Sequence, residues 1–289
     1  NGNLIKFEYN HRKSIIINVF YFPIKESVME EKNNFDQFKV NLHEDSSVGH
    51  AIAVMSGKGG VGKSSVTSMI ANKLNKQGYK VAIFDADITG PSIPQAFGID
   101  ESVTGTKEGL MYPGVSRDGI KVISVNMILP NKTDPVVWRS SIVTGVIKQF
   151  YSDVDWGEID YMLIDMPPGT SDVPLTVFQS LPIDGIVAVA TPQDLVGMVV
   201  EKSLKMARMM GKDVLGIVEN MSYFKCPDCG SEHKIFGESH VEEVAEKHDI
   251  DTLSKLPIDP EIASKIDQGL IEDINPEGLD SIIEKIESL

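Results

Sequence analysis

Cysteine is scarce in this sequence of 289 residues, which contains only two. Two cysteines cannot hold together a disulfide-rich secreted scaffold, so that class of protein is excluded. Both lie within the segment Cys226-Pro227-Asp228-Cys229, a spacing that suits a metal or redox site better than a disulfide. Two thiols are nevertheless too few to complete a tetrahedral zinc site or an iron–sulfur cluster, each of which takes four ligands.

Basic residues are also in short supply, because 27 Lys and Arg face 42 Asp and Glu and leave a net charge of −15. A protein held on nucleic acid by counterion release, or on an anionic membrane, needs a basic face. The charge balance therefore argues against both kinds of partner. With 42% apolar and 24% charged residues, the composition is that of a globular protein rather than a disordered or fibrous one.

Long apolar runs are missing from the N-terminal segment. The run at residues 14–24 is too short to span a bilayer, and no small-residue cleavage site follows it. We interpret it as a short strand or an extended appendage rather than a targeting signal. Because residues 30–49 are rich in charged and amide side chains, we expect residues 1–49 to form a poorly ordered appendage. The first methionine is Met29, so the assignment of residues 1–28 to the natural start stays open.

After this segment, short apolar runs alternate with helical stretches. Six runs are predicted to be strands: 51–55, 80–84, 120–125, 160–164, 185–190 and 214–218. They are almost continuously apolar, as strands covered on both faces of a parallel sheet must be. Between the first two, residues 63–77 place Val66, Met69, Ile70 and Leu74 on one helical face. The pattern predicts an α/β fold, with a mostly parallel sheet, helices on both faces and a ligand at the carboxyl ends of the strands.

A glycine-rich motif lies between the first predicted strand and this helix. It matches the pattern of a glycine, any four residues, then glycine, lysine and serine or threonine. Loop N–H groups and the helix dipole favour phosphate, Lys63 would reach the β- and γ-phosphates, and Ser64 would bind Mg²⁺. The predicted phosphate-binding residues are Gly57, Lys58, Gly59, Gly60, Val61, Gly62, Lys63, Ser64 and Ser65.

Two other predicted strands end in carboxylates. Asp85 and Asp87 end the second strand one residue apart, so their side chains point to the same side. Asp87 is the candidate to orient or deprotonate an attacking water, with Asp85 nearer the metal, and the alternative is a solvated turn. Asp165 ends the fourth strand in the Walker B arrangement, which holds the Mg²⁺ shell. Gly169, in the following Pro-Pro-Gly turn, could offer its N–H to the γ-phosphate.

The Cys-x-x-Cys segment follows the sixth predicted strand and admits three interpretations. His233 could add a ligand to a small zinc site, and a thioredoxin-like redox pair is weakened because the motif does not open a helix. Alternatively, two copies of the chain across a two-fold axis would supply four cysteines to one shared cluster. The residues alone leave iron–sulfur, zinc and redox roles open.

Five motifs in order resemble those of the Mrp/NBP35 family of P-loop ATPases, over about residues 50–275. They are the phosphate loop and residues 85–92, 165–170, 191–193 and 219–224, the last just before the cysteines. Members of that family carry iron–sulfur clusters. The resemblance implies ATP binding, slow hydrolysis, a homodimer and a [4Fe-4S] cluster bridged by Cys226 and Cys229 of both subunits. It also implies that Asn220 reads the adenine, a role that its amide suits.

The second lysine of the phosphate loop, Lys58, resembles the deviant loop of dimeric ATPases such as the nitrogenase iron protein and the Min and Par proteins. In that group the early lysine reaches the partner's phosphates across a nucleotide-sandwich dimer, as an arginine finger does. The resemblance therefore implies that Lys58 acts in catalysis together with Lys63 and Asp87.

We therefore predict that residues 50–289 form a cytoplasmic ATPase domain that carries a labile [4Fe-4S] cluster to apo-proteins, with hydrolysis of ATP as the switch. One alternative is a Min- or Par-type positioning ATPase, which needs a basic tail or patch. The C-terminus at 279–289 is amphipathic but acidic, and we expect its Ile282, Ile283 and Ile286 to dock on the core. Another alternative is a zinc-stabilised nucleotide-switch adaptor. Neither nucleic acid nor membrane is an expected partner.

Overall fold

The computed structural model divides the chain into two compact units, Asn1–Gln37 and Phe38–Leu289. The structure describes residues 5–7, 15–17 and 38–289, apart from 89, 91, 108, 130–137, 139, 171, 196 and 197. In the first unit, β1 (Ile5–Phe7) pairs antiparallel with β2 (Ile15–Ile17). β2 falls within the apolar run that we interpreted as a strand or an extended appendage. The rest of the predicted appendage before Phe38 lies outside the described residues.

The second unit is built on a sheet that has nine strands within the described residues. In chain order they are β3 (Ser47–Ser56), β4 (Val81–Asp85), β7 (Gly114–Val115), β8 (Lys121–Ser124), β9 (Glu158–Asp165), β10 (Gly185–Ala190), β11 (Val214–Lys225), β12 (Glu232–His233) and β13 (Leu253–Pro257). Their spatial order is β12-β11-β10-β3-β9-β4-β8-β7, with β13 beside β11. Neighbours are parallel except at β7 and β12. The mostly parallel sheet and all six predicted strands are confirmed, whereas β13 was not predicted.

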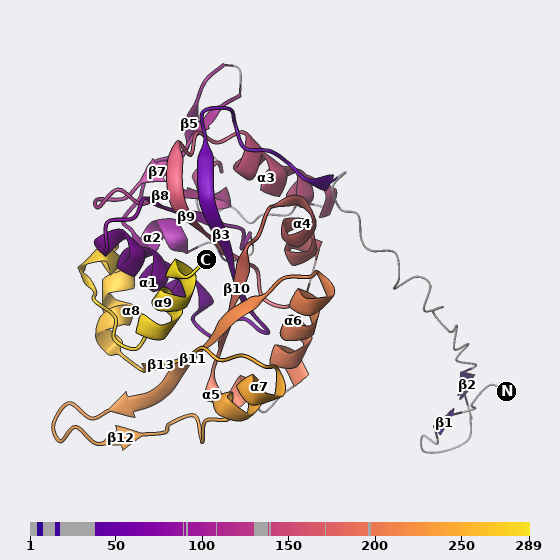
Figure 1. The fold of residues 1–289 in the computed structure, drawn as a ribbon, viewed down its shortest axis with the longest axis vertical. Helices are drawn as coiled ribbons and strands as arrows, with labels where there is room; N and C mark the ends of the chain where they lie inside the picture. The colour runs from indigo at the N-terminus through magenta and orange to yellow at the C-terminus, as the bar shows by residue number, and fades with distance from the viewer. Residues whose placement is uncertain are drawn as a thin grey trace. The chain divides into compact units, whose positions relative to one another are not determined.

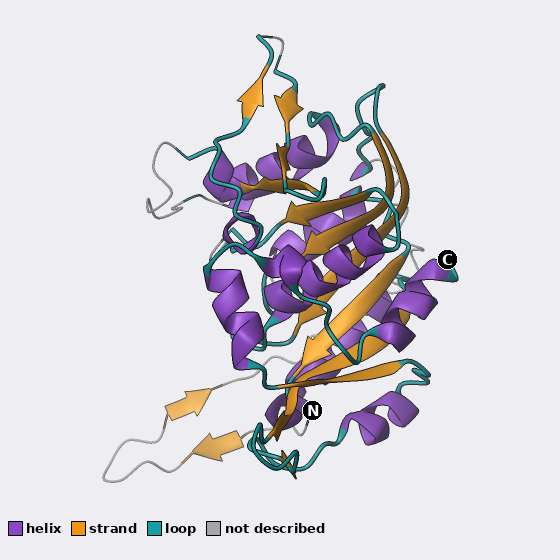
Figure 2. Cartoon of the chain, turned by 90° about the vertical axis from the view of Figure 1, so that its left-hand side faces the viewer, coloured by secondary structure: helices purple, strands orange, loops and turns teal. Residues whose placement is uncertain are grey.

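Helices cover both faces of this sheet (Figure 1). On one face lie α1 (Lys63–Lys76), α2 (Ile93–Ala96), α8 (Pro260–Asp267) and α9 (Asp280–Glu287). On the other lie α3 (Ser140–Ser152), α4 (Asp172–Ser180), α6 (Met198–Met209) and α7 (Val241–Lys247), with the short α5 (Pro192–Leu195) before α6. The hairpin of β5 (Thr104–Gly105) and β6 (Met111–Tyr112) stands out from this body at the top of Figure 2. Among the described residues, no helix combines the length and apolar character needed to cross a bilayer.

Alternate residues of the central strands face opposite helix layers, as the pleat of a strand requires. In β3, Ile52 and Val54 pack into the core beneath α1, while Ala53 and Met55 pack into the core beneath α3 and α4. The four predicted core residues of α1 are buried, and so are the three isoleucines of α9. Both predictions of docked helical faces are therefore confirmed.

The second unit begins earlier than we predicted. Residues 38–49, which we assigned to the appendage, belong to it, because the N–H of Val40 donates to the carbonyl of Ser180 at 3.0 Å. Val40 and Leu42 also pack against the core beneath α3 and α4. A few apolar side chains thus dock a segment whose composition is mostly polar.

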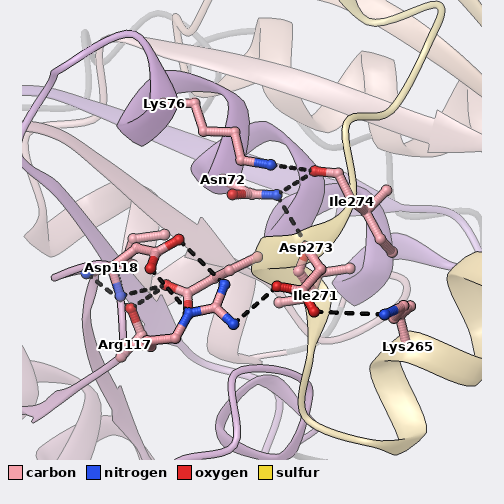
Figure 3. Close-up of polar contacts among 11 residues, drawn as sticks. Asn72, Lys76, Arg117, Asp118, Lys265, Ile271, Asp273 and Ile274 are labelled. Carbon is pink, nitrogen blue, oxygen red and sulfur yellow. Dashed lines mark hydrogen bonds and ion pairs between the residues drawn. The ribbon is translucent and has the colours of Figure 1, made fainter.

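The C-terminal part of the chain is tied to α1 by polar contacts (Figure 3). The amide of Asn72 donates to the carbonyls of Ile271 and Ile274, at 3.0 and 2.8 Å. The ammonium of Lys76 donates to the same Ile274 carbonyl at 2.6 Å. One end of α1 thus meets the phosphate loop, and its other half holds the segment that leads into α9.

Candidate functional site

The predicted phosphate loop joins the end of β3 to the start of α1, at the carboxyl edge of the sheet. Gly60 and Gly62 have φ angles of 82° and 81°, a region that glycine adopts without strain. A Cβ atom on Gly62 would lie 2.2 Å from the Asn220 amide nitrogen, so a larger residue there would displace the Asn220 side chain. Gly62 is also the N-cap of α1 and has no side chain to occupy the first-turn N–H groups. The loop therefore keeps donors available for an anion.

Lys63 and Asp165 form the centre of the site. The Lys63 ammonium lies 2.7 Å from Asp165 Oδ2 and 3.7 Å from Asp87 Oδ2. The Ser64 hydroxyl donates to Asp165 Oδ2 at 2.6 Å, and the Thr67 hydroxyl donates to Asp165 Oδ1 at 2.8 Å. The structure thus brings together the predicted phosphate-binding lysine, the predicted Mg²⁺ ligand and the Walker B carboxylate.

Asp85 and Asp87 are buried, so the solvated-turn alternative is wrong. Asp85 receives hydrogen bonds from the Ser124 hydroxyl at 2.9 Å and the N–H of Asp87 at 3.1 Å. Burial, followed by the charge of the neighbouring Asp165, raises the pKa of Asp85 to about 8. Asp87, rather than Asp85, lies within ion-pair distance of Lys63. The expectation that Asp85 lies nearer the metal stays a prediction.

The Pro-Pro-Gly turn after β9 lies against the phosphate loop. The N–H of Gly169, which we expected to be offered to the γ-phosphate, donates to the Ser56 carbonyl at 2.9 Å. Pro168 Cγ lies 3.8 Å from the position of a Cβ on Gly59. A phosphate that takes the Gly169 N–H must therefore replace the bond to Ser56.

Three further predicted residues lie in or beside the loop. Asn220, in β11, is buried and donates from its amide to the Val61 carbonyl at 2.9 Å. Its role at the adenine stays a prediction. Lys58 is exposed, and its carbonyl accepts from the Ser56 hydroxyl at 3.0 Å. Its role at a partner's phosphates stays a prediction. Ser65 lies half-buried in the first turn of α1.

The two cysteines lie in the turn between β11 and β12, with Cys226 half-buried and Cys229 exposed. The N–H of Cys226 donates to the Ser231 carbonyl, and the N–H of Gly230 donates to the Cys226 carbonyl, both at 2.9 Å. Hydrogen bonds with Ser231, and then with the Cys226 thiol, lower the pKa of the Cys229 thiol. A lowered pKa favours the thiolate, which is the form that binds metal.

The cysteine turn forms only part of a metal site. Among the described residues, no group of three or more His, Cys, Asp and Glu side chains is placed to hold a metal ion. His233, which we considered as a third ligand, lies in β12 and forms no such group with the two cysteines. The zinc site completed by His233 within one chain is therefore not assembled. The cysteines follow Asn220 along β11, six and nine residues beyond it, past an irregularity at Met221, whose φ is 56°.

A family model described as ParA: NUBPL iron-transfer P-loop NTPase matches residues 47–287. The chain belongs to this family. The resemblance that the five motifs carried is thereby confirmed, as is the P-loop NTPase fold.

Curated members of the family cover most of the chain. A protein of Clostridium perfringens named iron-sulfur cluster carrier protein is 47% identical over 234 residues, which are 78% of this chain and 82% of the relative. A protein of Methanocaldococcus jannaschii with the same name is 42% identical over 250 residues, 86% of each chain.

Solved structures show the same fold. The nucleotide-binding protein of Archaeoglobus fulgidus in complex with ADP superposes with a TM-score of 0.72 at 46% identity, over 81% of this chain and 91% of that one. The cell division ATPase MinD of Pyrococcus furiosus gives a TM-score of 0.59 at 21% identity, over 83% and 99% of the two chains. The likeness to MinD shows the fold alone.

Sequence reasoning missed two hydroxyl groups of the site, on Thr67 and Ser124. Ser124 ends β8, beside the strand that ends at Asp85, and donates to that carboxyl. Thr67 stands three residues after Ser64 and therefore on the same face of α1. That spacing is the signal by which Thr67 could have been found.

Proposed function

We propose that this chain is an ATP-dependent iron–sulfur cluster carrier, which holds a labile [4Fe-4S] cluster as cargo and passes it to apo-proteins. The family supports this function, as do the names of the two curated relatives. The observation that carries it is the cysteine turn, which holds one half-buried and one exposed thiol without a third ligand from the described part of the chain. Such a half-site suits a cluster that is shared and released.

Two copies of the chain complete the site in this proposal. A [4Fe-4S] cluster takes four thiolates, and a two-fold axis beside the turn supplies Cys226 and Cys229 twice. The same homodimer would bring the exposed Lys58 to the partner's phosphates. We place the carrier in the cytoplasm, because a reducing compartment keeps its thiols available.

ATP would bind with its phosphates in the loop between β3 and α1, where Lys63 meets the β- and γ-phosphates and Asn220 the adenine. Ser64 and Asp165 fit Mg²⁺, because their hydroxyl and carboxylate oxygens are the hard ligands that this ion prefers. Bound there, Mg²⁺ would neutralise charge on the phosphate oxygens. The Asp87 carboxylate lies 3.7 Å from the Lys63 ammonium and would orient or deprotonate the attacking water.

Two connections would link ATP to the cargo. A γ-phosphate that accepts the Gly169 N–H displaces the bond to Ser56 and so moves the Pro-Pro-Gly turn. β11 leads from Asn220 at the phosphate loop to Lys225 beside the cysteines, with an irregularity at Met221, whose φ is 56°. Slow hydrolysis would then reset the dimer geometry and gate loading or release of the cluster.

Neither alternative from the sequence has an observation in its favour. The likeness to MinD, at 21% identity, concerns the fold alone, and the net charge of −15 disfavours an anionic surface as partner. The zinc-stabilised adaptor needs ligands that the described part of one chain does not bring together.

Reconstitution with iron and sulfide tests the proposal. The parent, reconstituted without oxygen, should bind about two iron atoms per chain, which is one four-iron cluster per two chains, and should transfer them to an apo-ferredoxin. Cys226→Ser and Cys229→Ser should each lose the cluster, whereas Asp228→Asn, in the same turn, should keep it. Retention of the same cluster by either cysteine variant, or zinc in place of iron in the purified parent, would contradict the proposal.

A further inference from the structure

The two carboxylate oxygens of Asp165 have different partners. Oδ2 accepts from Ser64 at 2.6 Å and lies 2.7 Å from the Lys63 ammonium. Oδ1 accepts from the Thr67 hydroxyl at 2.8 Å. Thr67 and Asp165 are both 0% exposed, so water does not compete for this bond. The orientation of the carboxylate is thus fixed from two sides, by residues one helical turn apart.

Of these three partners, two have other tasks at the proposed nucleotide site. Lys63 is the residue that meets the phosphates, and Ser64 is the residue whose oxygen would face Mg²⁺. Thr67 lies one turn deeper in α1, behind both of them. Thr67 is therefore the partner of Asp165 that has no proposed contact with ATP or Mg²⁺.

The Thr67 hydroxyl has a second acceptor, the Lys63 carbonyl one turn back, at 3.0 Å. A hydroxyl has one hydrogen, so the two acceptors share it or compete for it. The carboxylate is the closer acceptor and the charged one, and hydrogen bonds to charged acceptors are the stronger. The geometry thus favours the bond to Asp165 over the ordinary back-bond of a helical threonine.

We infer that Thr67 is a positioning residue, which holds the Asp165 carboxylate in the orientation needed for the Mg²⁺ shell once Lys63 and Ser64 engage the nucleotide. The inference rests on the proposed nucleotide function and adds a residue that the phosphate-loop pattern does not include. Groups that orient metal ligands from behind typically change metal affinity by about 10- to 100-fold when they are removed. Removal of the Thr67 hydroxyl should therefore lower the affinity for the metal ion and leave the affinity for the nucleotide unchanged.

Three variants of the full chain separate this role from a structural one. Thr67→Val keeps the shape of the side chain and removes the hydroxyl, and Thr67→Ser keeps the hydroxyl. Ser68→Ala is the matched control, because its buried hydroxyl donates to the Ser64 carbonyl at 2.8 Å and not to Asp165. If Thr67→Val does not fold, Thr67→Ala takes its place in every comparison.

The measurements are the affinity for Mn²⁺, by electron paramagnetic resonance with a non-hydrolysable ATP analogue, and the affinity for the analogue alone in EDTA. Thr67→Val should bind Mn²⁺ about tenfold more weakly or worse, and its metal-free affinity for the analogue should stay within about twofold of the parent. Thr67→Ser and Ser68→Ala should stay within about twofold in both measurements.

Three results would overturn the inference: an unchanged Mn²⁺ affinity in Thr67→Val, an equal loss in Thr67→Ser, or an equal loss in Ser68→Ala. A parent that binds neither the analogue nor Mn²⁺ would contradict the proposed function together with this inference. A parent that binds both, with Thr67→Val unchanged, would contradict the inference alone.

Discussion

Lys63 and Lys58 belong to one loop but lie in opposite surroundings. Lys63 is 6% exposed and paired with Asp165, whereas Lys58 is exposed. Lys63→Ala removes the cation that faces the phosphates, so we expect ATP affinity to fall by about 3 kcal/mol, roughly 100-fold. Lys58→Ala should leave ATP affinity within about twofold and lower turnover on the order of 100-fold or more, as loss of an arginine finger does. Equilibrium binding of a fluorescent ATP analogue and steady-state phosphate release measure the two effects.

An exposed lysine elsewhere on the chain provides the control for this comparison. Lys202, in α6, is exposed and lies outside the proposed site, so Lys202→Ala should change neither binding nor turnover. An equal loss of ATP binding in the Lys58 and Lys63 variants would contradict a separate role for Lys58.

At the scale of the element, α1 joins the proposed nucleotide site to the C-terminal part of the chain. Asn72 is buried, and its amide satisfies two carbonyls, of Ile271 and Ile274 (Figure 3). Asn72→Ala leaves these carbonyls without that donor, so we expect the free energy of unfolding to fall by about 2 kcal/mol. Urea denaturation followed by circular dichroism measures the change. ATP affinity should stay within about twofold, because Asn72 lies two turns of helix beyond Ser64.

Asn75, on the same helix, is the matched control. It is half-buried, and its amide lies 3.5 Å from the Tyr79 carbonyl, a long contact. Asn75→Ala should therefore cost no more than about 0.5 kcal/mol. If both alanine variants lose the same stability, the contacts of Asn72 with the C-terminal segment are not what stabilises the fold.

The elements also show what the sequence could predict. The six central strands could be predicted because burial on both faces makes them continuously apolar. β13 escaped prediction because its segment, Leu-Ser-Lys-Leu-Pro, is short and half polar, and only its pairing with β11 makes it a strand. The docking of residues 38–49 likewise depends on contacts with distant parts of the chain.

The candidate site combines a contiguous motif with contacts between distant residues. Residues of the phosphate loop are contiguous, so their pattern predicts their arrangement. The bond between Thr67 and Asp165 spans 98 positions, and it exists because β3 and β9 pair side by side. Likewise, the sequence placed a possible ligand, His233, near the cysteines, but in the folded chain these three side chains form no metal-binding group. These contacts depend on which distant strands pair with each other, and that pairing leaves no local pattern in a single sequence.

At the scale of the whole molecule, the proposed homodimer predicts that two variants, each inactive alone, recover ATP turnover when they are mixed. Lys58→Ala chains keep Lys63 and bind ATP, and Lys63→Ala chains keep Lys58 and can offer it to a partner. Random pairing of an equal mixture gives about half mixed dimers, each with one competent site of two, so about a quarter of the parental turnover should return. Phosphate release from the mixture, compared with the sum of the separate chains, measures the recovered turnover.

The control is a mixture of Lys58→Ala with a Lys58→Ala, Lys63→Ala double variant, which should recover no turnover. If the first mixture also recovers no turnover, although affinity capture of one tagged variant retains the other and so shows mixed dimers, Lys58 acts within its own chain. The dimer would then complete the cluster site without sharing the ATP site.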